Sequence, residues 1–439
     1  MEITQSPISM IMMPNNNYPS AKTIHRQQLA NGIILLVYEN FASQSVVVEG
    51  VVRAGALAEA REKAGLANFT AASLMRGTHK RSFEQIYEDL ESVGADLGFS
   101  SGQHTTGFSA TSLVEDLDLV LDLLAQSLRQ PAFPPAQIEQ VRGLLFTGLQ
   151  IRANDTRYQA GLAFDELLYR DHPYGRSEHG YFETISAVSR DDILDFHAGY
   201  YGPRQMIITL VGAIKAEDAQ AKVESALGDW HNPQQRLLPL VPDARRPATL
   251  QRTAVAMPEK TQSDIVLGLP GPLRLAPDYL DASLMNTILG VFGMMGRIGK
   301  SVREEQGLAY YAYSRLQGDL GPSPWYACAG VAPQNVEQAV ASIRQEIERI
   351  QNEPVPADEL ADSQAYRTGS MPVSLETNSG VAGVITDMEL YGLGLDYLVN
   401  FPGLIWAITP ERVQAAAQKY LSTEQMAVAV AGPNSVSSD

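Results

Sequence analysis

The chain has 439 residues, of which 45% are hydrophobic and 19% charged, as in a globular protein with two or more domains. A formal net charge of −17 argues against binding to nucleic acids, which needs a basic surface, and to anionic membranes. No apolar run reaches the roughly 18 residues of a membrane span. Cys328 is the only cysteine, so an intrachain disulfide is excluded and a reducing compartment is favoured.

The N-terminal segment has no basic region and only a short apolar stretch at residues 8–13, so we expect no secretory signal peptide. We therefore expect a cytoplasmic location, and the sequence leaves a periplasmic one open.

The first elements of the chain are β-rich runs at residues 33–38 and 45–53. Four helices are predicted after them, near residues 62–75, 83–94, 114–128 and 135–152. Strands and helices are thus grouped in blocks rather than alternating. This order predicts an α+β fold with a mostly antiparallel sheet.

Residues 185–212 and 405–432 are two copies of one pattern, and they align without a gap at an offset of 220. Each copy has a helix capped by Ser189 or Thr409, followed by an apolar run that ends in glycine and reads as a buried strand. The motif Phe-Pro-Pro-Ala at 133–136 also matches Pro-Val-Pro-Ala at 354–357, because each follows one helix and precedes another. We infer an internal duplication of one α/β unit.

Proline density marks the boundary between the two copies. Four prolines occur between residues 232 and 248, which excludes helix and central strand and predicts an extended linker. We therefore predict domains at residues 20–232 and 249–434, joined by a linker at 233–248.

The segment 289–314 contains several spaced glycines, among them Gly290, Gly293 and Gly296, which suit either close backbone packing or a flexible loop. Its Gly299-Lys300-Ser301 is not a phosphate loop, because position 294 is Met and a helix rather than a strand is expected before it.

Arg303 and Tyr310 stand seven apart in the same segment, around Glu-Glu-Gln-Gly-Leu-Ala. Without further context, Arg303 could pair with Glu304 or Glu305 on the surface, and Tyr310 could be a half-buried strand residue. Elsewhere, the loop with His172 and His179 has no zinc-ligand spacing, and Cys328 lies in an apolar run typical of a buried strand.

The predicted helix at 62–75 belongs to a longer motif, Gly-Leu-Ala-Asn-Phe-Thr-Ala-Ala-Ser-Leu-Met-Arg-Gly-Thr at residues 65–78. Taken alone it is an amphipathic, alanine-rich helix. It resembles the zinc-binding helix of the pitrilysin/insulinase peptidases, with H-x-x-E-H in a frame like G-L-A-H-F-x-E-H-x-x-x-x-G-T. The frame residues are Gly65, Leu66, Ala67, Phe69, Gly77 and Thr78. The resemblance covers residues 19–433 and implies a duplicated peptidase fold.

At the chemical positions of this family the chain carries Asn68, Ala71 and Ala72, and the position of the third ligand falls near Leu149. Alanine and leucine cannot bind zinc, and asparagine is a poor ligand. The resemblance therefore implies that this chain holds no cofactor and that zinc is expected in a partner subunit.

The stretch around Arg303 and Tyr310 resembles the family segment G-x-x-S-R-L-x-x-x-L-R-x-x-x-G-L-A-Y. There the Arg/Tyr pair binds the substrate backbone and stabilises the tetrahedral intermediate. The resemblance implies a non-catalytic subunit that forms a heterodimer with a zinc-bearing homologue around a peptide, with Arg303 and Tyr310 acting in trans. The alternatives are a non-enzymatic peptide-binding or assembly subunit, like the core proteins of respiratory complexes, and a homodimer.

Overall fold

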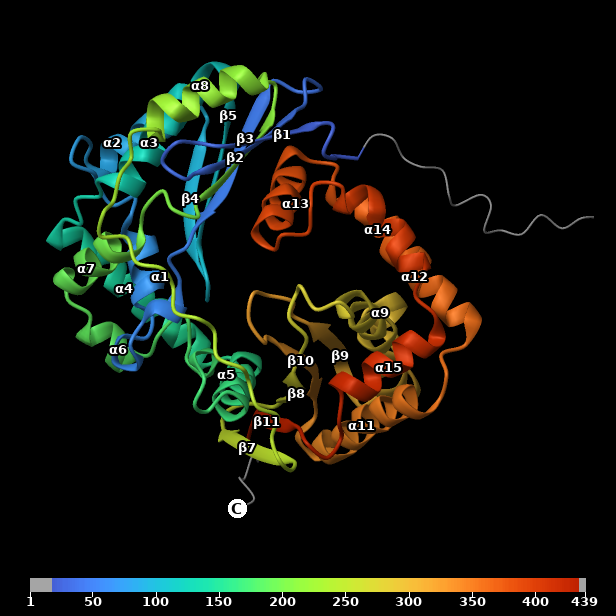
Figure 1. The fold of residues 1–439 in the computed structure, drawn as a ribbon. Coiled ribbons are helices and arrows are strands. Elements are labelled where there is room, and N and C mark those ends of the chain that lie inside the picture. Colours follow the sequence, from blue (N-terminus) through green and yellow to red (C-terminus); the bar gives the residue numbers. More distant parts are fainter. Residues whose placement is uncertain (1–17, 434–439) are drawn as a thin grey trace, which may run out of the picture.

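The computed structural model describes residues 18–433, and the segment for which we expect no signal peptide lies outside this range. The chain forms two α+β halves, each built on one mostly antiparallel sheet (Figure 1), which confirms the predicted fold class. Within residues 18–433, no helix combines the length and apolar character that crossing a bilayer requires.

The first sheet has six strands in the order β1-β2-β6-β3-β5-β4. Only β2 and β6 pair in parallel, and the other neighbours are antiparallel. The strands are β1 Ile24–Gln28, β2 Ile34–Glu39, β3 Ser45–Val52, β4 Asp96–Ser101, β5 Thr106–Leu113 and β6 Ile207–Gly212.

The second sheet has five strands in the order β7-β11-β8-β10-β9, again with one parallel pair, β7 and β11. Apart from β1, each strand of the first sheet has a counterpart here in the same place and direction. The strands are β7 Gln251–Ala256, β8 Ser263–Pro270, β9 Ala309–Leu316, β10 Pro324–Val331 and β11 Ala427–Gly432.

Helices surround both sheets (Figure 1). In the first half they are α1 Leu66–Ser73, α2 Phe83–Ser92, α3 Leu117–Arg129, α4 Pro135–Ala153, α5 Thr156–Leu168, α6 Phe182–Ala187, α7 Arg190–Tyr200 and α8 Ala216–Leu227. In the second half they are α9 Tyr279–Gly290, α10 Phe292–Gly299, α11 Val336–Asn352, α12 Ala357–Ser374, α13 Asn378–Leu390, α14 Tyr397–Trp406 and α15 Pro410–Tyr420. The described chain also contains short 3₁₀ turns and one π-helical turn, Lys300–Glu305.

The structure confirms the repeated helix–strand pattern. Helices α7 and α15 begin after Ser189 and Thr409, whose side chains accept hydrogen bonds from the amides of Asp192 and Arg412, at 3.1 and 3.4 Å. The strands that follow, β6 and β11, are buried along their whole length and lie at equivalent places inside the two sheets. Residues 220 apart in the sequence therefore form equivalent helices, α7 and α15, with the same type of N-cap. They also form equivalent buried strands, β6 and β11, with corresponding neighbours in the two sheets.

One helix of each half packs on the sheet of the other half. Helix α5 lies against β7, β8 and β11, and α13 lies against β3 and β6 (Figure 1). The hydroxyl of Thr156 on α5 donates to the carboxylate of Asp264 on β8, which is only 1% exposed and also accepts from Tyr311. Thr386 on α13 and Thr209 on β6 share a hydrogen bond of 2.7 Å. Because α5 and α13 each pack on the sheet of the opposite half, the two halves are joined by direct contacts as well as by the linker.

The linker itself contains no regular element, since neither helix nor strand occurs between Leu227 and Gln251. It runs along the first half and contributes contacts there, for example through the carbonyl oxygen of Pro242, which lies 2.9 Å from Nε2 of His172.

Candidate functional site

The frame residues of the motif are held in place by packing and hydrogen bonds within this chain. Gly65 precedes α1 with φ of 90°, and a Cβ there would lie 2.8 Å from the backbone of Gly180. Leu66, Ala67 and Phe69 are buried in the core of the first half. Thr78 donates to the side chain of Gln126 at 3.0 Å. These contacts give the frame a structural role that does not depend on a metal.

The chemical positions of the motif cannot form a zinc site. Asn68 and Ala72 are four residues apart on α1, where two histidines could share one ion. Ala71 is buried, and Leu149 lies in the core of the first half on α4, which packs beside α1. Two methyl groups, an isobutyl group and an amide do not provide the ligands that zinc requires. No group of three or more metal-ligating His, Cys, Asp or Glu side chains occurs elsewhere between residues 18 and 433.

A buried carboxylate caps α1 at its N-terminus. Glu59 is 8% exposed and accepts hydrogen bonds from the amides of Gly65, at 2.9 Å, and Ala67, at 2.5 Å. Burial raises the pKa of Glu59 to about 8, although these hydrogen bonds and the charge of Arg176 oppose the shift. Sequence reasoning missed this residue, because a cap that lies seven residues before the first helical residue, Leu66, has no recognisable spacing.

Arg303 and Tyr310 lie at the edge of the second sheet. Arg303 is half-buried on the π-helical turn, and its side chain makes no hydrogen bond or ion pair within residues 18–433. Tyr310 is 82% exposed on the edge strand β9. Gly330 pairs with Tyr311 and Val331 with Ala309, so Tyr310 is the unpaired residue of a β-bulge. Bulges and π-turns are both common where a functional side chain must be re-aimed.

The turn between these two residues is fixed by Gln306 and Gly307. The amide nitrogen of the Gln306 side chain donates to Ser342 on α11 at 3.0 Å and to Ser301 at 3.2 Å. Gly307 has φ of 60°, which favours glycine, and the next amide, of Leu308, bonds the Val302 carbonyl at 2.9 Å. The sequence motif contains Gln306, but only the helix packing reveals its anchoring role.

The spaced glycines lie at the end of α9 and in α10 rather than in an extended loop. A Cβ on Gly290 would lie 2.1 Å from the Ser314 amide nitrogen, and one on Gly296 would lie 2.5 Å from the Gly290 nitrogen. Close backbone packing thus accounts for these two positions. Gly293, with φ of 63° and open space around it, needs glycine only for its backbone conformation.

The local packing of the two remaining candidates, His172 and Cys328, explains them without a catalytic role. His172 accepts from the Tyr174 amide at 3.1 Å and lies beside the rings of Tyr169 and Tyr174. Cys328 is 2% exposed on β10, as predicted, and burial raises the pKa of its thiol to about 12. A thiol with so high a pKa is no nucleophile near neutral pH.

A duplicated α+β fold with the frame of a zinc-peptidase helix defines a metallopeptidase-like protein. Two family models match the chain: "Insulinase (Peptidase family M16)" over residues 35–177, and "Peptidase M16 inactive domain" over residues 187–366. The chain therefore belongs to peptidase family M16, the insulinase family, and the resemblance seen in its motifs is confirmed.

Relatives with similar sequences span nearly the whole chain. An uncharacterized zinc protease of Streptomyces coelicolor is 25% identical, over 94% of this chain and 90% of its own. The beta subunit of the mitochondrial-processing peptidase of Saccharomyces cerevisiae is 24% identical, over 84% and 81%. A crystal structure from Pseudomonas fluorescens, described as a peptidase M16 inactive domain, is 26% identical with a TM-score of 0.86, over 95% of this chain and all of its own.

Proposed function

We propose that the chain is the non-catalytic subunit of a heterodimeric zinc metallopeptidase, and that Arg303 and Tyr310 act in trans at the site of a zinc-bearing homologue. One observation carries the proposal. Helix α1 keeps its structural frame while its ligand positions hold Asn68 and Ala72, and the Arg303 and Tyr310 side chains have no polar partner within residues 18–433.

The chemistry of the pair suits peptide binding. A guanidinium offers several donors in a planar fork, which match the carbonyl oxygens of an extended peptide. A phenol hydroxyl can donate to an oxygen on which negative charge develops during attack on the peptide bond. The bulge at Tyr310 and the anchored turn at Gln306 support this role, because donors aimed in advance need no reorganisation during the reaction.

A partner chain is supported by two kinds of observation. The yeast relative is by name one subunit of a processing peptidase. In addition, Tyr310 is 82% exposed in this chain, and large aromatic side chains are enriched at protein interfaces. We infer that the partner covers this edge of the second sheet, while the helix around Asn68 lines the opposite wall of the peptide-binding space.

Reconstitution with a zinc-bearing M16 homologue from the same genome tests the proposal. Each chain is purified alone and in the mixture, and cleavage of a fluorogenic peptide library is measured with and without a chelator. We expect chelator-sensitive cleavage only in the mixture, and metal analysis should find stoichiometric zinc only in the homologue. Tight zinc and chelator-sensitive cleavage by this chain alone would refute the proposal.

The variant Arg303→Ala separates this role from a purely structural one. We expect it to lower the turnover of the mixture on dilute peptide by at least about tenfold, the usual effect of losing a hydrogen bond from a charged donor. Arg170→Ala, at an exposed position in the first half, is the matched control and should leave turnover unchanged. Unchanged turnover in Arg303→Ala would favour an assembly subunit, and a stable homodimer of this chain that does not associate with the zinc-bearing homologue would favour the homodimer alternative.

A further inference from the structure

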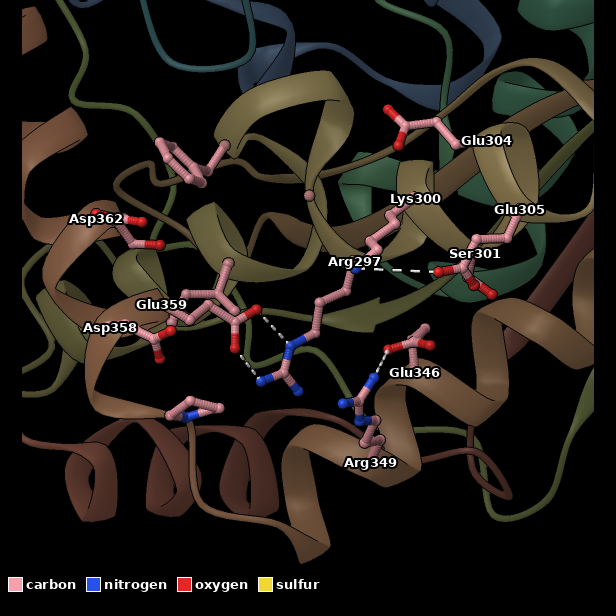
Figure 2. Close-up of a pocket in the computed structure, with 15 residues that line it drawn as sticks. Arg297, Lys300, Ser301, Glu304, Glu305, Glu346, Arg349, Asp358, Glu359 and Asp362 are labelled. Carbon is pink, nitrogen blue, oxygen red and sulfur yellow. Dashed lines mark hydrogen bonds and ion pairs between the residues drawn. The ribbon is translucent and has the colours of Figure 1, made fainter.

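A polar pocket lies among the helices of the second half. Its volume is about 460 Å³, within the roughly 300–1,000 Å³ of small-molecule sites. It is lined by α10, the π-helical turn, α11 and the first turns of α12 (Figure 2). None of the functions proposed above uses it.

Arg297 lies at the base of this pocket with one side of its guanidinium unused. Its Nε and Nη2 donate to the two carboxylate oxygens of Glu359, at 2.8 and 2.5 Å. The residue is 8% exposed, and its Nη1 is buried without a hydrogen-bond partner among the described residues. In Figure 2 the guanidinium points into the space between Glu359 and Glu346. A buried donor without an acceptor is costly, so an acceptor from a ligand would be favourable here.

Two further buried groups around the pocket make no hydrogen bond within the described residues. Glu346 on α11 is 8% exposed, and its Oε2 accepts no hydrogen bond, although Arg349 approaches it at 3.7 Å. Burial raises the pKa of Glu346, against the charges of Arg349 and Arg297. Ser363 on α12 is fully buried, and its hydroxyl also has no partner in the described chain. The pocket thus offers one buried cationic donor without an acceptor and one carboxylate oxygen that accepts no hydrogen bond.

The lining has more carboxylates than cations. The three cations are Arg297, Lys300 and Arg349. The six carboxylates are Glu304, Glu305, Glu346, Asp358, Glu359 and Asp362. A surplus of three negative charges favours a cationic ligand. A metal ion is not indicated, because no group of three side chains within residues 18–433 has the geometry to hold one.

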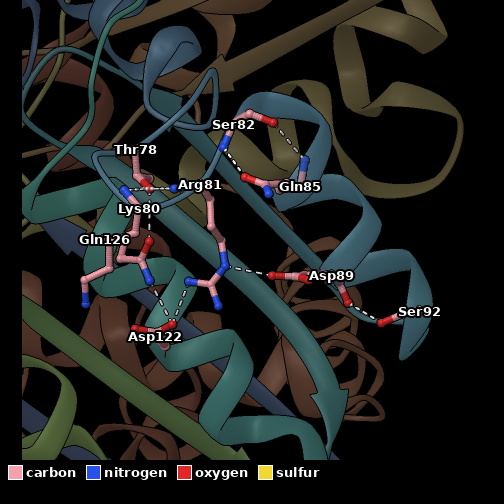
Figure 3. A network of polar contacts seen from close by, with 9 residues as sticks. All are labelled: Thr78, Lys80, Arg81, Ser82, Gln85, Asp89, Ser92, Asp122 and Gln126. Carbon is pink, nitrogen blue, oxygen red and sulfur yellow. Dashed lines mark hydrogen bonds and ion pairs between the residues drawn. The ribbon is translucent and has the colours of Figure 1, made fainter.

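The corresponding region of the first half shows that the charged groups at this place in the fold can be paired with one another. There, Arg81 pairs with both Asp89 and Asp122 at 2.7 Å, and Gln126 on α3 donates to Asp122 at 2.8 Å (Figure 3). Thr78 completes the network by donating to Gln126. The charged groups of this network pair with one another, whereas in the second half the equivalent helix α11 faces an open pocket.

We propose that this pocket binds a basic α-amino acid, either free or as the C-terminal residue of a peptide. Its carboxylate would accept from Arg297 Nη1, its cationic groups would pair with Glu346 and the surplus carboxylates, and Ser363 would add a hydrogen bond. The proposal does not depend on the peptidase partner, because all three groups belong to this chain.

Isothermal titration of the purified full-length chain tests this site. L-Arginine and L-lysine should bind saturably, and an acetylated peptide ending in arginine distinguishes the peptide source from the free amino acid. Putrescine, which lacks the carboxylate, and L-glutamate, which lacks the basic side chain, should each bind at least about tenfold more weakly. No saturable binding of either basic amino acid or of the peptide up to about 10 mM would overturn the proposal.

Two variants assign the binding to this pocket. Glu346→Gln and Ser363→Ala should each weaken the binding of L-arginine, the former by about tenfold, the usual value of a hydrogen bond to a charged group. Glu348→Gln is the matched control, because it removes an exposed carboxylate from the same helix. Equal affinity of the Glu346→Gln and Glu348→Gln proteins, with both folded by circular dichroism, would refute the assignment.

Discussion

Replacement of Glu59 by glutamine should remove the pH dependence of stability that this carboxyl causes. Burial raises its pKa from its usual 4.5 to about 8, so the folded chain binds this proton more tightly than the unfolded chain does. Its contribution to stability is therefore fully present below pH 4.5 and is lost as the pH rises towards 8. Between about pH 5 and pH 8 the loss is on the order of 3 to 4 kcal/mol.

Glutamine removes this titration but also one of the two acceptors for the Gly65 and Ala67 amides, at a cost of about 1 kcal/mol. The two proteins should therefore be about equally stable near pH 5, and Glu59→Gln should be the more stable near pH 8. At about 2–4 °C per kcal/mol for a domain of this size, the difference in melting temperature should change by on the order of 10 °C. Differential scanning calorimetry across this range measures it, with the exposed Glu62→Gln as control. Parallel curves for Glu59→Gln and the native protein would refute the reasoning.

Three further substitutions test the packing of the fold. Gly290→Ala should lower the free energy of unfolding by several kcal/mol, because the new methyl group would lie 2.1 Å from the Ser314 amide nitrogen. The control is Gly143→Ala on α4, where a methyl group would meet open space and should leave the protein equally or more stable. Urea unfolding measures both changes. Asp264→Ala should cost about 3 kcal/mol and increase hydrogen exchange in α5, since the buried carboxylate joins that helix to the second sheet. Phe69→Ala should cost about 3–5 kcal/mol in thermal unfolding, because its ring is fully buried between α1 and the core of the first half.

Much of the fold could be predicted from the sequence, because its signals are local. The capped helices after Ser189 and Thr409 and the apolar runs behind them identify the duplicated unit, and the proline-rich linker separates the copies. Strands β4 and β5 were not predicted, since Gly98 and the serines around Phe99 dilute the alternation of buried residues. The exchange of α5 and α13 between the halves left no signal either, because it depends on contacts between residues far apart in the sequence.

Only those residues of the candidate site that belong to a recognisable sequence motif could be predicted. Asn68, Ala72, Arg303 and Tyr310 were found because their motifs resemble those of the pitrilysin/insulinase family, and the structure adds the bulge and the anchored turn that position the last two. The second-half pocket was not predicted, because its groups come from three helices that meet only in the folded chain.

The turnover of the reconstituted complex with Tyr310→Phe tests the central claim most directly. This change removes one hydroxyl from a side chain that is 82% exposed, so the fold and the zinc content of the partner should stay the same. We expect kcat to fall by about 100-fold with Tyr310→Phe, whereas Tyr87→Phe, at another exposed tyrosine, should leave it unchanged. A complex that assembles fully and cleaves peptide at the native rate with Tyr310→Phe would contradict that claim.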